Sequence, residues 1–85
     1  MTIQEVAEDR KQKAYSMIRV LKIHDLLIGE FLMQKKPHED IIDTYDEECE
    51  KYTEAMDRLE ELNYLIQETK KASLIIKNTL FELIY

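Results

Sequence analysis

The scarcity of turn-forming residues is the strongest constraint on the fold of this chain. Its 85 residues include one glycine, Gly29, and one proline, Pro37. A β-sheet needs a turn every few residues, and turns draw on Gly and Pro. Apolar residues also recur at spacings of three and four, as they do on one face of a helix. We therefore expect an all-α fold built from long helices.

The first helix is predicted over residues 2–35. Thr2 and Glu5 have the spacing of a capping box, which marks a helix N-terminus. Pro37 is expected to end the helix, because the residue before a proline avoids helical angles. The predicted turn is therefore residues 36–38. The apolar stripe of this helix consists of Met17, Val20, Leu21, Leu27, Ile28, Phe31 and Leu32.

A second helix is predicted over residues 38–70, followed by a helical segment at 71–85 that either continues it or forms a short third helix. Acidic residues just after Pro37 suit a first helical turn. The apolar stripe consists of Ile42, Tyr45, Cys49, Tyr52, Met56, Leu59, Leu62 and Ile66. The expected architecture is a single domain, a long antiparallel helical hairpin. Two helices alone cannot bury such wide stripes, so we expect a helical bundle or dimer.

The C-terminal segment carries apolar side chains on two sides. With the turn at 36–38, residues from Ala72 onward would project beyond the first helix or fold back on it. A helix that is apolar on two sides is normally buried on two sides. We therefore predict a partner interface, whose occupant is a second copy or another protein unless a third helix fills it within one chain. Its residues are Leu74, Ile75, Leu80, Phe81, Ile84 and Tyr85.

A histidine lies in the middle of the first apolar stripe. A turn at 36–38 would pair His24 with Cys49 and a polar Arg10 with Asn63, while Phe31 would meet Ile42 and Met17 would meet Met56. An imidazole beside a thiol can activate a nucleophile, but such a site needs an open pocket and an orienting third group. We interpret His24, Cys49 and Asn63 as buried polar residues that fix the register of the helices.

The net charge of −6 is unevenly distributed along the chain. Residues 1–36 carry +2, residues 37–71 carry −8 and residues 72–85 are neutral. A surface this acidic argues against nucleic acid as a partner, because phosphates attract Lys and Arg. The acidic run could imitate a row of phosphates or could be an ordinary solvated helix face. Its residues are Asp40, Asp43, Asp46, Glu47, Glu50, Glu54 and Asp57.

No catalytic, cofactor-binding or metal-binding motif is recognisable. The acidic run lacks the glycine of a calcium loop and the Glu-x-x-His pairs of a bundle metal site. A small dimeric all-helical enzyme is conceivable if Arg10, Arg19 and Lys22 meet around an anionic substrate. A single cysteine, the absence of an apolar signal segment and the absence of about 20 consecutive apolar residues predict a cytoplasmic protein with no membrane span.

These features together predict a non-catalytic protein–protein interaction module. The first hypothesis is a small adaptor or chaperone-like protein that binds a protein partner, itself or both through its apolar C-terminal helix. The alternative is a small acidic inhibitor, phage-encoded or regulatory, that blocks a larger protein by occupying a basic surface. The dimeric enzyme is a second alternative.

Overall fold

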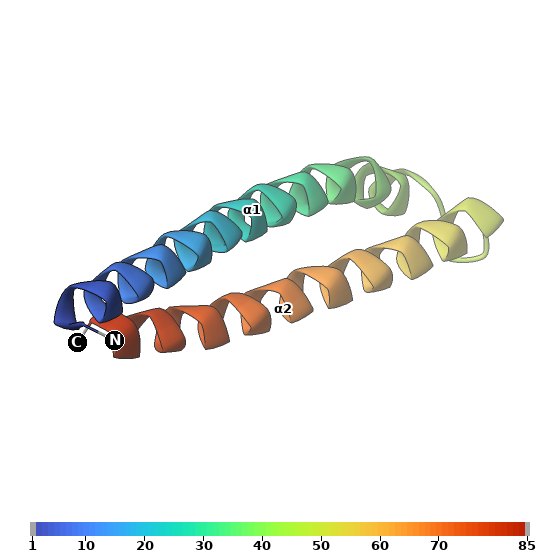
Figure 1. Ribbon diagram of the computed structural model, residues 1–85. Helices are drawn as coiled ribbons and strands as arrows, with labels where there is room; N and C mark the ends of the chain where they lie inside the picture. The colour runs from blue at the N-terminus through green and yellow to red at the C-terminus, as the bar shows by residue number, and fades with distance from the viewer. Residues whose placement is uncertain (1, 85) are drawn as a thin grey trace.

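The computed structural model describes residues 2–84, which form two long α-helices. Helix α1 spans Ile3–Thr44 and helix α2 spans Glu50–Ile84. The helices run antiparallel side by side, and both ends of the chain lie at the same end of the molecule (Figure 1). The hairpin measures 68 × 16 × 15 Å. The predicted all-α antiparallel hairpin is confirmed.

The start of α1 follows the predicted capping box. The Thr2 hydroxyl accepts a hydrogen bond from the Glu5 backbone N–H at 3.2 Å. The Glu5 carboxylate accepts one from the Thr2 backbone N–H at 3.4 Å. Two backbone donors that the helix itself cannot satisfy therefore find partners.

The turn lies at residues 45–49, so the prediction of a turn at 36–38 was wrong. Pro37 is exposed inside α1, which continues to Thr44. A proline in a helix interior costs one backbone hydrogen bond and a steric clash. Here the segment after it, at His38 and Ile42, packs on α2 and offsets that cost. Figure 1 shows α1 changing direction close to its turn end, as expected at a proline.

The turn is built without glycine or proline. Tyr45 leaves the helix with extended backbone angles, φ −106° and ψ 151°, while its N–H still donates to the Ile41 carbonyl. The Asp46 carbonyl then accepts a hydrogen bond from the Cys49 N–H at 2.9 Å. Asp is a favoured turn residue. The acidic residues Glu39, Asp40 and Asp43, predicted for a first helical turn, instead lie in the last turns of α1.

The C-terminal segment neither projects nor forms a third helix within residues 2–84. Helix α2 runs without a break through residues 67–73 to Ile84. The C-terminal part of α2 lies along the N-terminal half of α1 (Figure 1). The later turn lengthens the first arm, so that α1 extends beyond α2: with His24 level with Ser73, Ile84 lies near Lys13, and the exposed residues 3–12 of α1 continue past the end of α2.

The hairpin has a thin core. The buried residues among those described are Ala55, Leu62, Ile66 and Ser73, all on α2, and none lies on the described part of α1. The accessible surface is 7135 Å². A compact monomer of this mass would expose about 5,300 Å². One copy of the chain therefore leaves far more surface exposed than a globular protein of its size does.

Candidate functional site

The two helices meet along a seam with the spacing of a coiled coil. Buried and half-buried residues recur at alternating intervals of three and four, as in a heptad repeat. On α1 the seam consists of Ala14, Met17, Leu21, His24, Ile28, Phe31, Lys35, His38 and Ile42. On α2 it consists of Tyr52, Ala55, Leu59, Leu62, Ile66, Thr69, Ser73, Ile76, Leu80 and Leu83.

A polar layer crosses the seam near its middle. A hydrogen bond joins His24 Nδ1 and Ser73 Oγ, which are 2.8 Å apart. The predicted pairing of His24 with Cys49 is therefore wrong, because it depended on the earlier turn. Because the helices are antiparallel, a residue seven before His24 on α1 lies level with a residue seven after Ser73 on α2, and the reverse. Met17 therefore lies level with Leu80, and Phe31 lies level with Ile66.

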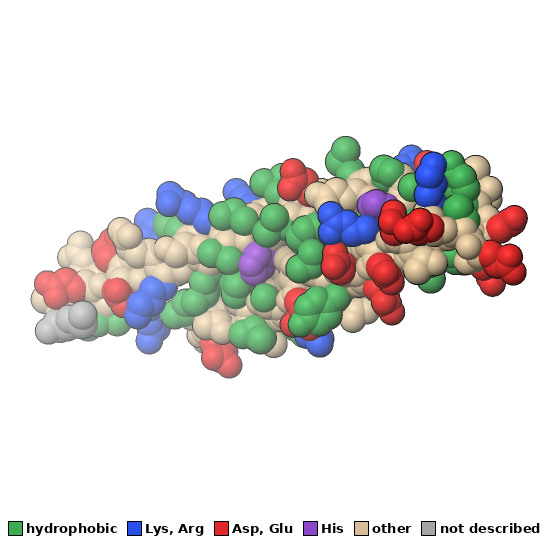
Figure 2. Space-filling view, turned by 90° about the vertical axis from the view of Figure 1, so that its right-hand side faces the viewer, with side chains coloured by type: hydrophobic (Ala, Val, Ile, Leu, Met, Phe, Trp, Pro, Cys, Tyr) green, Lys and Arg blue, Asp and Glu red, His purple; other side chains and the backbone are tan. Residues whose placement is uncertain are grey.

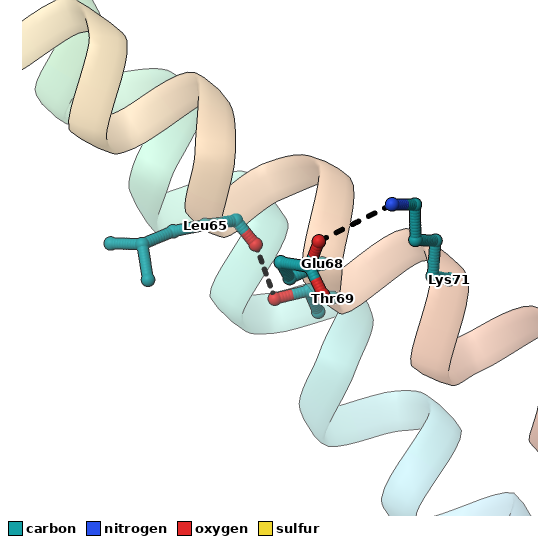
Figure 3. Close-up of polar contacts among 4 residues, drawn as sticks. All are labelled: Leu65, Glu68, Thr69 and Lys71. Carbon is teal, nitrogen blue, oxygen red and sulfur yellow. Dashed lines mark hydrogen bonds and ion pairs between the residues drawn. The ribbon is translucent and has the colours of Figure 1, made fainter.

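The neighbouring polar residue of the seam is satisfied within its own helix. The Thr69 hydroxyl donates to the Leu65 carbonyl at 2.7 Å, as Figure 3 shows. Figure 3 also shows the Lys71 ammonium beside the Glu68 carboxylate, 3.3 Å away on the outside of α2. Among the residues that the structure describes, no buried side-chain N or O atom lacks a hydrogen-bond partner. His24, Ser73 and Thr69 therefore cost little at their seam positions, because each has a hydrogen-bond partner.

Residues from both helices line a shallow hollow near the turn, so these residues lie on the same side of the hairpin. Ile41, Glu54 and Arg58 line it from the two helices. Residues seven apart lie on the same row of a heptad helix. Val20 and Leu27 therefore share the row of Ile41, Leu65 and Ala72 share the row of Arg58, and Ile75 shares the row of Glu54. We call this side the Leu27 face.

Apolar side chains gather near the centre of the Leu27 face, beside Glu68, which shares the row of Ile75, and Glu30, which shares the row of Ile23. Ile23 lies between Val20 and Leu27 on the outside of α1, and the other members come from α2. Exposed fractions reach 54% for Ile23 and 66% for Ile75. We call this group the Leu27 patch, and it consists of Val20, Ile23, Leu27, Leu65, Ala72 and Ile75. In a space-filling view, hydrophobic side chains gather in the middle of the elongated molecule (Figure 2).

The opposite side has a different character. A hollow there is lined by Asp25, Lys70, Leu74 and Lys77. A second hollow on the same side, nearer the chain termini, is lined by Lys11, Tyr15, Ile18 and Leu83 among others. Phe81 follows Leu74 by seven residues and so shares its row. We call this side the Leu74 face; it combines apolar side chains with lysines.

The described partner-interface residues predicted for the C-terminal segment do not form one surface. They lie on the Leu74 face, in the Leu27 patch and in the seam. Leu74 and Phe81 are 59% and 64% exposed and lie on the Leu74 face. Ile75 lies in the Leu27 patch. Leu80 is half-buried in the seam, so it belongs to the hairpin's own core. Tyr85 and the side chain of Ile84 lie outside the described residues.

The predicted acidic residues are all exposed and surround the turn end of the hairpin. They are Asp40, Asp43, Asp46, Glu47, Glu50, Glu54 and Asp57. Because the turn falls among them, they come from the end of α1, the turn and the start of α2. They do not form the single helical row that the sequence suggested. Figure 2 shows acidic side chains crowding the end of the molecule opposite the chain termini.

Two of the predicted polar register residues lie elsewhere. Cys49 is a half-buried free thiol directly before α2, about 25 residues along the chain from His24, at the turn end. Asn63 is exposed beside the buried Leu62. Lys35 and His38, which the sequence reading left out of the seam, occupy seam positions. Their 3-and-4 spacing with Phe31 and Ile42 is the signal that could have found them.

The basic residues of the enzyme hypothesis do not share one hollow. Arg10 lines the hollow that holds Leu83, whereas Arg19 and Lys22 line another with Gln12. Within residues 2–84, no cluster of three or more His, Cys, Asp and Glu could hold a metal ion. Neither described helix has a stretch that is long and apolar enough to cross a membrane.

Comparison with models of protein families finds no match to this chain, and neither do comparisons with curated proteins and with solved structures.

Proposed function

We propose that this protein is a non-catalytic interaction module, a small adaptor or chaperone-like protein that docks a protein partner on its Leu74 face. The observation that supports the proposal is the large exposed surface of the hairpin, which includes large apolar side chains such as Leu74 and Phe81. The accessible surface of 7135 Å² exceeds the value of about 5,300 Å² for a compact monomer of this mass. Large exposed apolar areas on a protein usually serve as interaction sites.

The composition of the Leu74 face favours a particular kind of partner. Leu74 and Phe81 offer apolar side chains on one row of α2, and Tyr15 and Ile18 extend the surface on α1. Lys70 and Lys77 flank Leu74, and Lys11 lies beside Tyr15. The complementary ligand is an amphipathic helix with an apolar stripe and acidic residues beside it. Apolar burial would supply most of the affinity, and the lysines would set the orientation.

Site-specific photo-crosslinking tests this docking surface. A photoreactive amino acid replaces Leu74 in one variant and Glu60 in a control variant, and both are expressed in the native host. Glu60 lies on the same row of α2, fourteen residues earlier, and is also exposed. The expected result is a defined crosslinked protein from position 74 only. Equal crosslinking from both positions would contradict the proposal.

Binding of the captured protein is then measured with purified components. Leu74→Asp with Phe81→Asp should weaken binding by about tenfold or more, because both changes place a charge in an apolar contact. Leu27→Asp, on the other face, should leave this binding unchanged. Circular dichroism establishes that each variant remains helical. Unaltered affinity of the Leu74/Phe81 variant would remove the Leu74 face as the docking site.

The acidic inhibitor remains the second candidate, supported by the exposed carboxylates at the turn end. Asp43→Lys with Glu47→Lys would abolish an interaction of that kind. Salt separates the two candidates, because binding led by surface charge weakens steeply as salt is added. Binding through Leu74 and Phe81 should change little.

A further inference from the structure

The Leu27 patch lies at the middle of the hairpin. Helix α1 spans Ile3–Thr44, so its midpoint falls at residues 23–24, inside the patch. His24 is joined to Ser73 at the same level of α2. The patch residues of α2 lie within about eight residues of Ser73 on either side, or about 12 Å. An apolar surface centred on the molecule can be covered by its own image under a twofold rotation.

The two halves of the hairpin carry opposite net charge. The turn half, residues 24–73, has fourteen acidic and six basic side chains, a net of −8. The terminal half, residues 1–23 and 74–85, has four acidic and six basic side chains, a net of +2. If two copies stacked in the same direction, the two turn halves, each with a net charge of −8, would lie against each other and repel. Two copies stacked end for end would place each −8 half beside a +2 half, which lowers the repulsion.

We infer that two copies of this chain associate through their Leu27 faces, end for end, about a twofold axis that passes close to the His24–Ser73 layer. The product is a four-helix bundle in which the Leu27 patches cover one another. Both faces carry charges near their centres, Asp25, Lys70 and Lys77 on the Leu74 face and Glu30 and Glu68 on the Leu27 face, and such charges are costly to bury without partners. The position of the Leu27 patch at mid-length is what favours the Leu27 face for this contact.

The size of the face is sufficient for a stable dimer. The hairpin is 68 Å long and 16 Å wide. The part of the face that both helices form is about 52 Å long, the length of α2, and covers roughly 830 Å², close to the approximately 800 Å² per partner of a standard interface. Burial of Ile23 and Ile75 would also complete the core that the single hairpin lacks. Three observations therefore favour a second copy as the occupant of this face: the central position of the patch, the opposite net charges of the two halves and the area of the face.

Sedimentation of the unaltered protein at micromolar concentrations tests the association first. The expected species is a dimer, and a monomer at all such concentrations would overturn the inference. Ile23→Asp with Ile75→Asp should then weaken dimerisation by about tenfold or more. Both side chains are more than half exposed in the hairpin, so the helices should persist. Leu74→Asp is the matched control on the other face and should leave the dimer intact.

The orientation is tested by the distance between spin labels near the turn. Cys49 is changed to Ser, and Glu47→Cys supplies an exposed labelling site in the turn. An end-for-end dimer places the two labels at opposite ends, so their separation approaches the 68 Å length of the hairpin. A separation well under half that length would show copies stacked in the same direction and would overturn the inference.

The two sets of experiments fail independently. This inference concerns the Leu27 face, whereas the proposed function concerns the Leu74 face. A dimer that forms without partner docking would therefore support the inference and not the proposed function. Docking by a monomer would support the proposed function and not the inference.

Discussion

His24 and Ser73 join the two helices at mid-length through a hydrogen bond of 2.8 Å between Nδ1 and Oγ. Ser73 is 6% exposed, and the adjacent seam residues Leu21, Ile28 and Ile76 are apolar. A polar pair inside an apolar seam favours the register in which both groups find each other, because any slip leaves them unpaired. The bond therefore helps to fix which parts of α1 and α2 lie side by side.

Ser73→Ala should destabilise the hairpin. The change leaves His24 Nδ1 without its partner in a partly buried layer, at a cost of about 1 kcal/mol. The free energy of unfolding in urea measures this effect. Ser16→Ala is the control, because Ser16 is exposed on α1 and the same exchange there changes helix propensity alone. Equal stability changes in the two variants would show that the hydrogen bond contributes nothing.

Pro37→Ala should stabilise the protein by up to about 3 kcal/mol, because alanine restores the backbone donor and removes the clash in the interior of α1. Pro37 is exposed, so no packed side chain is lost. The thermal midpoint reports the gain. Lys36→Ala provides an adjacent exposed control that should change it little. A lower midpoint for Pro37→Ala would mean that the bend at the proline is required for packing on α2.

Gly29→Ala should stabilise α1 by about 1 kcal/mol, since glycine is a poor helix former. A Cβ added at Gly29 meets no other atom within 4 Å. Close approach of α2 is therefore not the reason for this glycine. Denaturant unfolding measures the gain, with Glu30→Ala as the neighbouring exposed control. A loss of stability would reveal a contact at Gly29 made by a second copy or another protein.

Leu80→Ala and Leu74→Ala should have different effects although the exchange is the same. Leu80 is half-buried in the seam, and its truncation should cost about 2 kcal/mol of unfolding free energy. Leu74 is 59% exposed, so its truncation should cost well under half as much. Chemical unfolding of both variants checks the difference. Similar losses at the two positions would place Leu74 in the hairpin's own core.

The placement of the turn shows where reasoning from sequence failed. Local rules assigned the break to Pro37, so the predicted apolar stripe of the first helix ended at Leu32, and Lys35 and His38 were left out of it. In the structure the 3-and-4 spacing of Phe31, Lys35, His38 and Ile42 runs straight through the proline. A spacing that continues across a proline indicates a continuous helix even when some of its members are polar.

The sequence by itself determined the helical fold class, the capping box at Thr2 and Glu5, and a hairpin with more apolar surface than it can bury. These follow from local propensity and periodicity, which act over one or two turns of helix. Only the tertiary structure decided the turn at residues 45–49, the pairing of His24 with Ser73 and the division of Leu74, Ile75 and Leu80 among two faces and the seam. Register is a sum over all the contacts between α1 and α2, and that sum outweighed the local cost of one exposed proline.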